Sequence, residues 1–154
     1  MEKQPCLIFA YGTLLNDEVT EAVLGRAPHG KKGTLIKHRR LAIKGKVYPA
    51  MVPSTSASDI VSGKVYSVSP DELKILDAFE DRRYERAEVE VAMPVGERVR
   101  ARAYVRSQND DSDLESDWDY KRFLRDHLTW YVHKCRLWAQ KHKASSSNRP
   151  ANLS

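Results

Sequence analysis

Two separate segments of the chain carry residues whose types and spacing could do chemistry. The first is Tyr11-Gly12-Thr13-Leu14, which directly follows a short apolar run. Gly12 permits the backbone to approach a ligand closely, and successive free amides in a tight turn can hold an anion. The pattern is also that of an ordinary turn between a strand and a helix, so both interpretations stay open.

The second segment centres on Glu80, near the predicted C-terminal end of a helix. The negative end of the helix dipole, the nearby carboxylates of Asp77 and Asp81, and partial burial all disfavour an ionised Glu80. We therefore predict a raised pKa for Glu80, which suits a group that accepts and later returns a proton near neutral pH. Arg82 and Arg83 would lower this pKa instead, and a solvated helix end is the alternative interpretation.

Other patterns that could support catalysis fail on spacing. Residues 25–32 approach a phosphate-binding loop, but Lys32 stands where a Ser or Thr must hold magnesium, and Pro28 removes an amide. No pair of histidines has the spacing of a zinc site. Cys6 and Cys135 fall on apolar segments, which favours structural roles over nucleophilic ones.

Length and charge narrow the class of protein. The chain has 154 residues, enough for one domain, and a formal net charge of +5 from 26 basic and 21 acidic residues. Residues 133–154 hold five lysines and arginines and no acid, so residues 1–132 balance to zero, which weakens a nucleic-acid interpretation. The longest apolar run, residues 6–11, is too short to span a membrane. Two cysteines are too few for a disulfide framework, so we expect a cytoplasmic protein. From the charge distribution and the short apolar runs, we expect no nucleic-acid partner and no membrane partner.

The elements that must position the two segments follow from apolar periodicity and turn residues. Residues 7–10 are predicted to form a short buried strand. Asn16 can cap a helix that ends at Gly25. Further strands are predicted over residues 33–37, 41–48 and 60–68, with a polar loop over residues 54–58.

The clearest predicted helix begins at Ser69. Ser69 is the N-cap, Pro70 takes the first helical position and Glu72 completes a capping box, and the helix ends near Asp81. A hairpin follows, with acidic side chains outward on its first strand and arginines outward on its second, which suits cross-strand pairing. The hairpin strands are predicted over residues 87–93 and 99–105, and an acidic loop over residues 108–117.

A single long helix is predicted from Trp118, and a disordered polar tail over residues 144–154. The apolar stripe of this helix comprises Leu124, Leu128, Tyr131, Cys135 and Trp138. The strands are too many and too short for a doubly wound sheet. The sequence therefore predicts an α+β fold, a small mixed β-barrel with flanking helices, with its domain over residues 6–143.

Three motifs in this order and spacing resemble the γ-glutamylcyclotransferase-like superfamily. They are residues 9–15, residues 48–52 and residues 76–86. The match is closest to the plant avirulence-induced-gene-like (AIG2-like) branch, which Trp118-Asp119-Tyr120 and Phe123 also resemble. The resemblance covers roughly residues 6–140.

The resemblance implies a small mixed barrel and an enzyme without a metal or organic cofactor. It implies that Glu80 is the catalytic acid and base in an intramolecular aminolysis that yields 5-oxoproline and a free amine. Thr13 stands where the family usually has serine, which keeps the hydroxyl. The γ-glutamyl moiety of a small-molecule substrate would be bound mainly through backbone amides of Tyr11, Gly12, Thr13, Leu14, Leu15 and Asn16.

A second interpretation keeps the fold and loses the activity. The chain would then be a binding or regulatory domain, with its basic tail in contact with an acidic partner. The presence of both Glu80 and the turn at residues 11–14 favours the enzyme, because a decayed site need keep neither. The leaving amine and the oligomeric state are left open.

Overall fold

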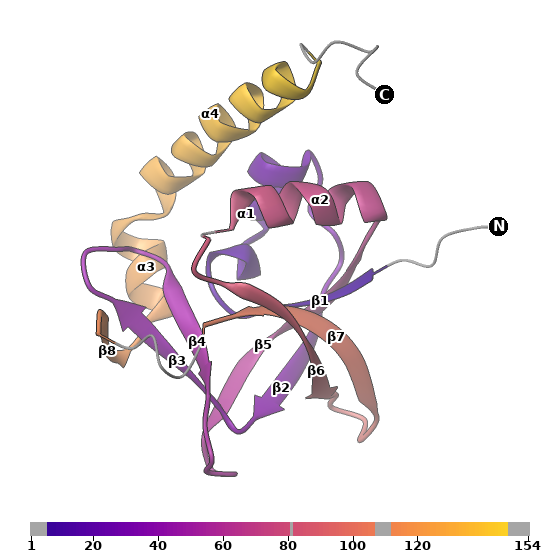
Figure 1. Ribbon diagram of the computed structural model, residues 1–154, viewed down its shortest axis with the longest axis vertical. Helices are drawn as coiled ribbons and strands as arrows, with labels where there is room; N and C mark the ends of the chain where they lie inside the picture. Colours follow the sequence, from indigo (N-terminus) through magenta and orange to yellow (C-terminus); the bar gives the residue numbers. More distant parts are fainter. Residues whose placement is uncertain (1–5, 81, 107–111, 148–154) are drawn as a thin grey trace, which may run out of the picture.

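Five strands close into a small mixed barrel (Figure 1). The computed structural model describes residues 6–80, 82–106 and 112–147. The barrel strands are β1 (Cys6–Ala10), β2 (Lys31–Ile36), β5 (Ile60–Val68), β6 (Glu85–Ala92) and β7 (Arg98–Val105). Their order is β1-β5-β2-β6-β7, and β1 pairs with β5 in antiparallel and with β7 in parallel. The α+β fold with a mixed barrel is therefore confirmed.

The β6–β7 hairpin sets acidic and basic side chains opposite one another. Glu88 lies across from Arg102, and Glu90 lies across from Arg100. Val89, between the two glutamates, and Val91, after them, are both buried. This register confirms the predicted pairing of acidic with basic side chains. Each such pair of opposite charges contributes roughly 0.2–1 kcal/mol to the stability of the sheet.

A second sheet lies beside the barrel (Figure 1). It consists of β4 (Pro49–Pro53), β3 (His38–Ile43) and β8 (Leu114–Asp117), in that order. The strand predicted over residues 41–48 is wrong beyond Ile43. The acidic loop predicted over residues 108–117 ends in β8, and its residues 108–111 lie outside the described residues. Neither β4 nor β8 shows an alternating pattern. β4 is an edge strand, where proline is tolerated, and β8 is short and largely exposed.

Two helices begin and end where the sequence predicts. Asn16 caps α1 (Asp17–Leu24) by accepting hydrogen bonds from two backbone amides, and Gly25 ends it with a left-handed φ of 86°. Ser69 and Glu72 form both hydrogen bonds of the capping box at the start of α2 (Pro70–Phe79). A single 3-10 turn, η1 (Thr13–Leu15), joins β1 to α1.

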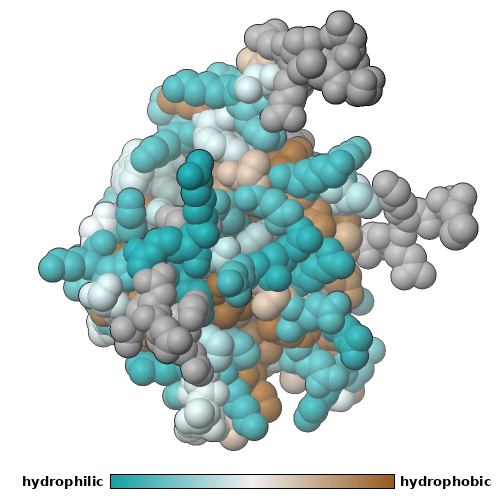
Figure 2. Space-filling view, viewed as in Figure 1, coloured by the Kyte–Doolittle hydropathy of each residue, from teal (hydrophilic) through white to brown (hydrophobic). Residues whose placement is uncertain are grey.

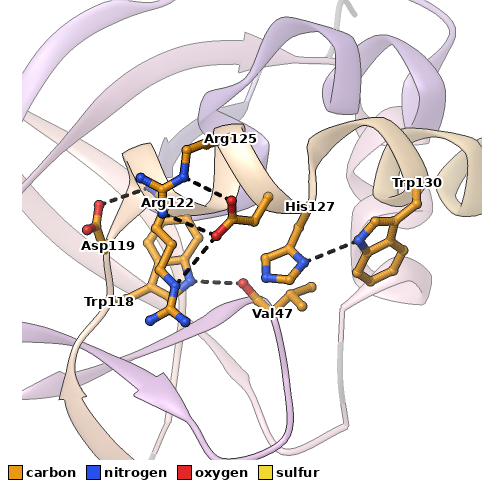
Figure 3. Close-up of polar contacts among 8 residues, drawn as sticks. Val47, Trp118, Asp119, Arg122, Arg125, His127 and Trp130 are labelled. Carbon is orange, nitrogen blue, oxygen red and sulfur yellow. Dashed lines mark hydrogen bonds and ion pairs between the residues drawn. The ribbon is translucent and has the colours of Figure 1, made fainter.

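The predicted long C-terminal helix is in fact two helices, α3 (Tyr120–Asp126) and α4 (Leu128–Ser147). The chain bends at His127, whose φ of −129° is not helical and whose ring accepts a hydrogen bond from Trp130 Nε1 at 3.2 Å (Figure 3). α4 runs on past Ala144, and residues 148–154 of the predicted tail lie outside the described residues. No helix in the described ranges is long and apolar enough to cross a membrane.

The core consists of two apolar clusters that share β1. Phe9 and Tyr11 belong to the cluster inside the barrel, whereas Ile8 and Ala10 belong to the cluster between the barrel and the helices. This division follows from the alternation of side chains along a strand. On the face viewed in Figure 2, hydrophilic side chains cover most of the surface and hydrophobic surface is visible between them.

Candidate active site

A cavity of about 250 Å³ lies among residues of β1, of the C-terminal end of α2 and of α4. Tyr11, Gly12, Thr13 and Leu14 line it, and so does Glu80. Two segments that are far apart in the sequence therefore converge on one cavity.

The turn after β1 keeps backbone amides available beside this cavity. The amides of Leu15 and Asn16 donate to the carbonyls of Gly12 and Thr13, at 3.0 and 3.1 Å. Thr13 and Leu14 begin η1, and their amides donate no hydrogen bond to the described part of the chain. Such successive amides at the start of a helical turn are suited to hold an oxygen that carries negative charge.

Gly12 is required by close packing rather than by its backbone angles. A Cβ atom at this position would lie 2.9 Å from both Cγ and Cδ of the Pro49 ring. A hydrogen atom alone therefore fits between the turn and β4. This contact sets the position of the turn at the edge of the cavity.

Glu80 is the C-cap residue of α2, where the chain leaves the helix for an extended conformation. Its backbone amide donates to the carbonyl of Leu76 at 3.0 Å, which fixes its backbone relative to the helix. The negative charge of Glu80 acts on several phenol groups around the cavity. Burial is the largest cause of a raised pKa, and the Glu80 charge raises the pKa further, for Tyr11, Tyr66, Tyr104 and Tyr131.

A tyrosine network holds the walls of the cavity in place. Tyr11 donates its hydroxyl to the carbonyl of Tyr104 at 2.6 Å, and Tyr104 donates its own to Asp77 Oδ1 at 2.7 Å. Thr13 Oγ1 donates to the Tyr131 hydroxyl at 3.4 Å, which links the turn to α4. Since the raised pKa values keep these phenols protonated, each remains a hydrogen-bond donor.

Arg40 supports the turn from behind. Its Nη1 donates to the carbonyl of Tyr11 at 2.8 Å, and its guanidinium lies 5.2 Å from the centre of the Trp118 ring. Burial lowers the pKa of Arg40, although an arginine remains charged at neutral pH. The positive charge therefore stabilises the carbonyl end of β1 next to the cavity.

Leu15 and Asn16, which the resemblance also implied as binding residues, do not line the cavity. Asn16 Oδ1 accepts hydrogen bonds from the amides of Glu18 and Val19, so its side chain serves α1. The carbonyl of Leu15 accepts a hydrogen bond from Lys64 Nζ at 2.9 Å. Both residues position the turn from its far side.

Several lining residues were not proposed from the sequence as site residues. Tyr48 and Tyr84 occur inside two of the motifs that carry the resemblance, so that signal was available. The residues on α4 gave only a helical spacing, which is equally that of a core stripe. These α4 residues are Tyr131, Lys134, Cys135 and Trp138. Within the described ranges, no cluster of three or more side chains could hold a metal ion.

Comparisons with known proteins found matches in sequence and in fold. A family model described as gamma-glutamyl cyclotransferase, AIG2-like, matches residues 8–122. AIG2-like protein D of Arabidopsis thaliana is 38% identical over 136 residues, which cover 86% of this chain and 88% of that protein. A solution structure of another Arabidopsis thaliana protein is 28% identical with a TM-score of 0.68, and the match covers 97% of each chain. A structure described as gamma-glutamyl cyclotransferase shares the fold, with 21% identity, a TM-score of 0.60 and coverage of 86% and 87%.

Proposed function

This chain belongs to the AIG2-like gamma-glutamyl cyclotransferase family, and on that premise we propose that it releases 5-oxoproline from a γ-glutamyl amine or amide. The observation that carries the proposal is the convergence of Glu80 and the turn at residues 11–14 on one cavity. Under this proposal Glu80 is the catalytic acid and base. The turn holds the γ-glutamyl moiety of a small-molecule substrate.

The proposed reaction is an intramolecular aminolysis. Glu80 takes a proton from the substrate's α-ammonium, and the free amine attacks the substrate's own γ-carbonyl carbon to close a five-membered ring. The amides of Thr13 and Leu14 stabilise the oxyanion that forms. Glu80 then returns its proton to the departing amine as the bond between that nitrogen and the γ-carbon breaks, and the second proton lost by the ring nitrogen leaves with the departing amine, which is released as an ammonium.

The surroundings of the cavity support this chemistry. Because the nucleophile is part of the substrate, the protein has only to hold a ring-closing geometry and to move one proton. The reaction as written uses no metal and no organic cofactor. Phe79 and Trp138 form an aromatic wall of the same cavity that Glu80 lines.

We also propose a cytoplasmic location. Cys6 and Cys135 are both free thiols, and burial raises the pKa of the Cys135 thiol to about 12, so this thiol is unreactive. Two free cysteines fit a reducing compartment.

The test is release of 5-oxoproline by the purified full chain from γ-glutamyl amino acids, glutathione and γ-glutamyl-lysine. We expect turnover of at least one of these, and a fall of about 10²–10⁴-fold in Glu80→Gln, because the proton transfer is lost. The control is Glu85→Gln, the same substitution at an exposed position on β6. It should keep full activity.

Two outcomes would contradict the proposal. Full turnover by Glu80→Gln would show that the assigned mechanism is wrong. Binding of γ-glutamyl compounds by the unaltered chain without any 5-oxoproline release would favour the alternative, a silent binding domain of the same fold. Circular dichroism of each variant separates loss of chemistry from loss of folding.

A further inference from the structure

Lys134 gives the cavity a positive charge that the proposed chemistry does not use. Among the described residues, Glu80 and Lys134 are the only charged residues that line the cavity. The cavity therefore offers one negative and one positive group.

Lys134 lies on the face of α4 that lines the cavity. It follows Tyr131 by three residues and precedes Trp138 by four, and residues with this spacing share one helix face. Trp138 fixes α4 against α2 through an edge contact with Phe79, with ring centres 5.2 Å apart. Lys134 itself is exposed, whereas the adjacent Cys135 is buried, so the ammonium lies at the mouth of the cavity.

A γ-glutamyl amino acid carries charges that match this arrangement. Its α-ammonium faces Glu80 in the proposed mechanism, and its γ-glutamyl part is held at the turn of residues 11–14. The second carboxylate, on the amino acid that leaves, then requires a cation. A cavity of about 250 Å³ is smaller than the roughly 300–1,000 Å³ of most drug-sized pockets. In so small a cavity, the leaving residue of a dipeptide would reach the mouth.

We infer that Lys134 is a specificity residue that selects substrates whose leaving amine carries a carboxylate, that is, γ-glutamyl amino acids over neutral γ-glutamyl amines. The inference rests on the proposed function and names its substrate class. Because Lys134 lies away from the bonds that change, its ion pair would form equally in the ground state and the transition state. Its loss should therefore raise KM and leave kcat nearly unchanged.

The test compares γ-glutamyl-alanine with γ-glutamyl-ethylamide, which differ only by the carboxylate on the leaving group. We expect the unaltered chain to prefer γ-glutamyl-alanine about three- to tenfold in kcat/KM, as for a partly exposed ion pair. Lys134→Met should abolish this preference through KM. Lys134→Arg should retain it, and so should Lys141→Met, a matched change at an exposed α4 lysine outside the cavity lining.

The inference is overturned if Lys134→Met keeps the preference, if it weakens both substrates equally, or if the unaltered chain has no preference. If the unaltered chain converts neither substrate, calorimetric binding of the same two compounds decides the inference, and the proposed function fails only if glutathione and γ-glutamyl-lysine are not converted either. Tighter binding of γ-glutamyl-alanine that is lost in Lys134→Met would then support it. Equal binding of both compounds would overturn it.

Discussion

Asp77 and Glu80 are three residues apart, yet their surroundings give them different roles. Asp77 accepts a hydrogen bond from the Tyr104 hydroxyl at 2.7 Å and pairs with Arg86. These partners occupy both of its carboxylate oxygens. Glu80 is the carboxylate that lines the cavity, so Glu80 rather than Asp77 is the residue that we propose as acid and base.

We predict that Gly12→Ala damages both stability and catalysis. The added Cβ would lie 2.9 Å from the Pro49 ring, so the turn must shift. We expect a loss of about 1–3 kcal/mol in the free energy of unfolding, as for other overpacked sites. We also expect a fall of about 10²-fold in kcat/KM, because the amides of the turn move. Urea denaturation and the 5-oxoproline assay measure the two effects.

The matched control for this prediction is the double variant Gly12→Ala/Pro49→Ala. Removing the ring carbons relieves the contact, so the two substitutions together should cost less than the sum of each alone. Strictly additive effects would show that the Pro49 ring is not what requires glycine at position 12.

Some residues of the candidate site could be proposed from short sequence patterns, and others could not. Glu80 and the turn at residues 11–14 could be proposed from the sequence, because a capped helix end and a glycine after a strand are local patterns. Tyr131 and Lys134 could not, since the packing of α4 against α2 decides which of its residues face the cavity. That packing depends on contacts such as Phe79 with Trp138, which are distant in sequence.

At the level of elements, α2 begins at a capping box and ends at Glu80. Its first turn is held by the Ser69 and Glu72 capping box, and Arg26 adds an ion pair to Glu72 at 2.6 Å. Its last turn delivers Glu80 to the cavity. Because the helix is rigid, the capped start of α2 also fixes where Glu80 lies at its other end.

We predict that Ser69→Ala lowers the free energy of unfolding by about 1 kcal/mol, because the Glu72 amide loses its acceptor. The KM for a γ-glutamyl substrate should stay nearly unchanged, since the folded helix still ends at Glu80. The measurement is chemical denaturation beside steady-state kinetics. Ser62→Ala, at an exposed position on β5, is the control and should change stability by less than about 0.5 kcal/mol. Equal losses in both variants would contradict a capping role.

The elements that could be predicted are those whose signals are complete within one segment. The caps at Asn16 and Ser69 and the β6–β7 hairpin are of this kind. β4 and β8 are stabilised by pairing with β3, and their own residues show no alternation. The bend at His127 interrupts an apolar spacing that continues on both sides of it, so periodicity alone indicates one helix.

At the scale of the whole molecule, one ion pair ties the barrel to the second sheet. Arg106 follows β7, is 2% exposed, and donates its backbone amide to Met51 in β4 at 2.8 Å. Its Nη2 pairs at 2.8 Å with Asp113, which precedes β8. Arg83 pairs with the same carboxylate at 2.8 Å.

This pair predicts acid sensitivity. The hydrogen bond from Arg106, together with the charges of Arg106 and Arg83, lowers the pKa of Asp113. A carboxyl with a lowered pKa in the folded state stabilises the protein above its unfolded pKa of about 3.9, and that stability is lost as the pH falls through the folded pKa. Asp113→Asn should therefore cost about 2 kcal/mol at pH 7, and the difference from the unaltered chain should shrink below about pH 4.

The measurement is the free energy of unfolding in urea at several pH values. Asp117→Asn is the control, because Asp117 is exposed and its ion pair with Arg39 is long, at 3.7 Å. It should change stability by less than about 1 kcal/mol at any pH. A loss in Asp113→Asn that is the same at pH 7 and pH 3 would rule out the charge pair as its cause.

The alternation of side chains along β1 has one more consequence. Since Phe9 packs inside the barrel and Ile8 packs under the helices, a single strand contributes to both apolar clusters. A substitution of the exposed Lys134 on α4 should therefore leave the packing inside the barrel unchanged.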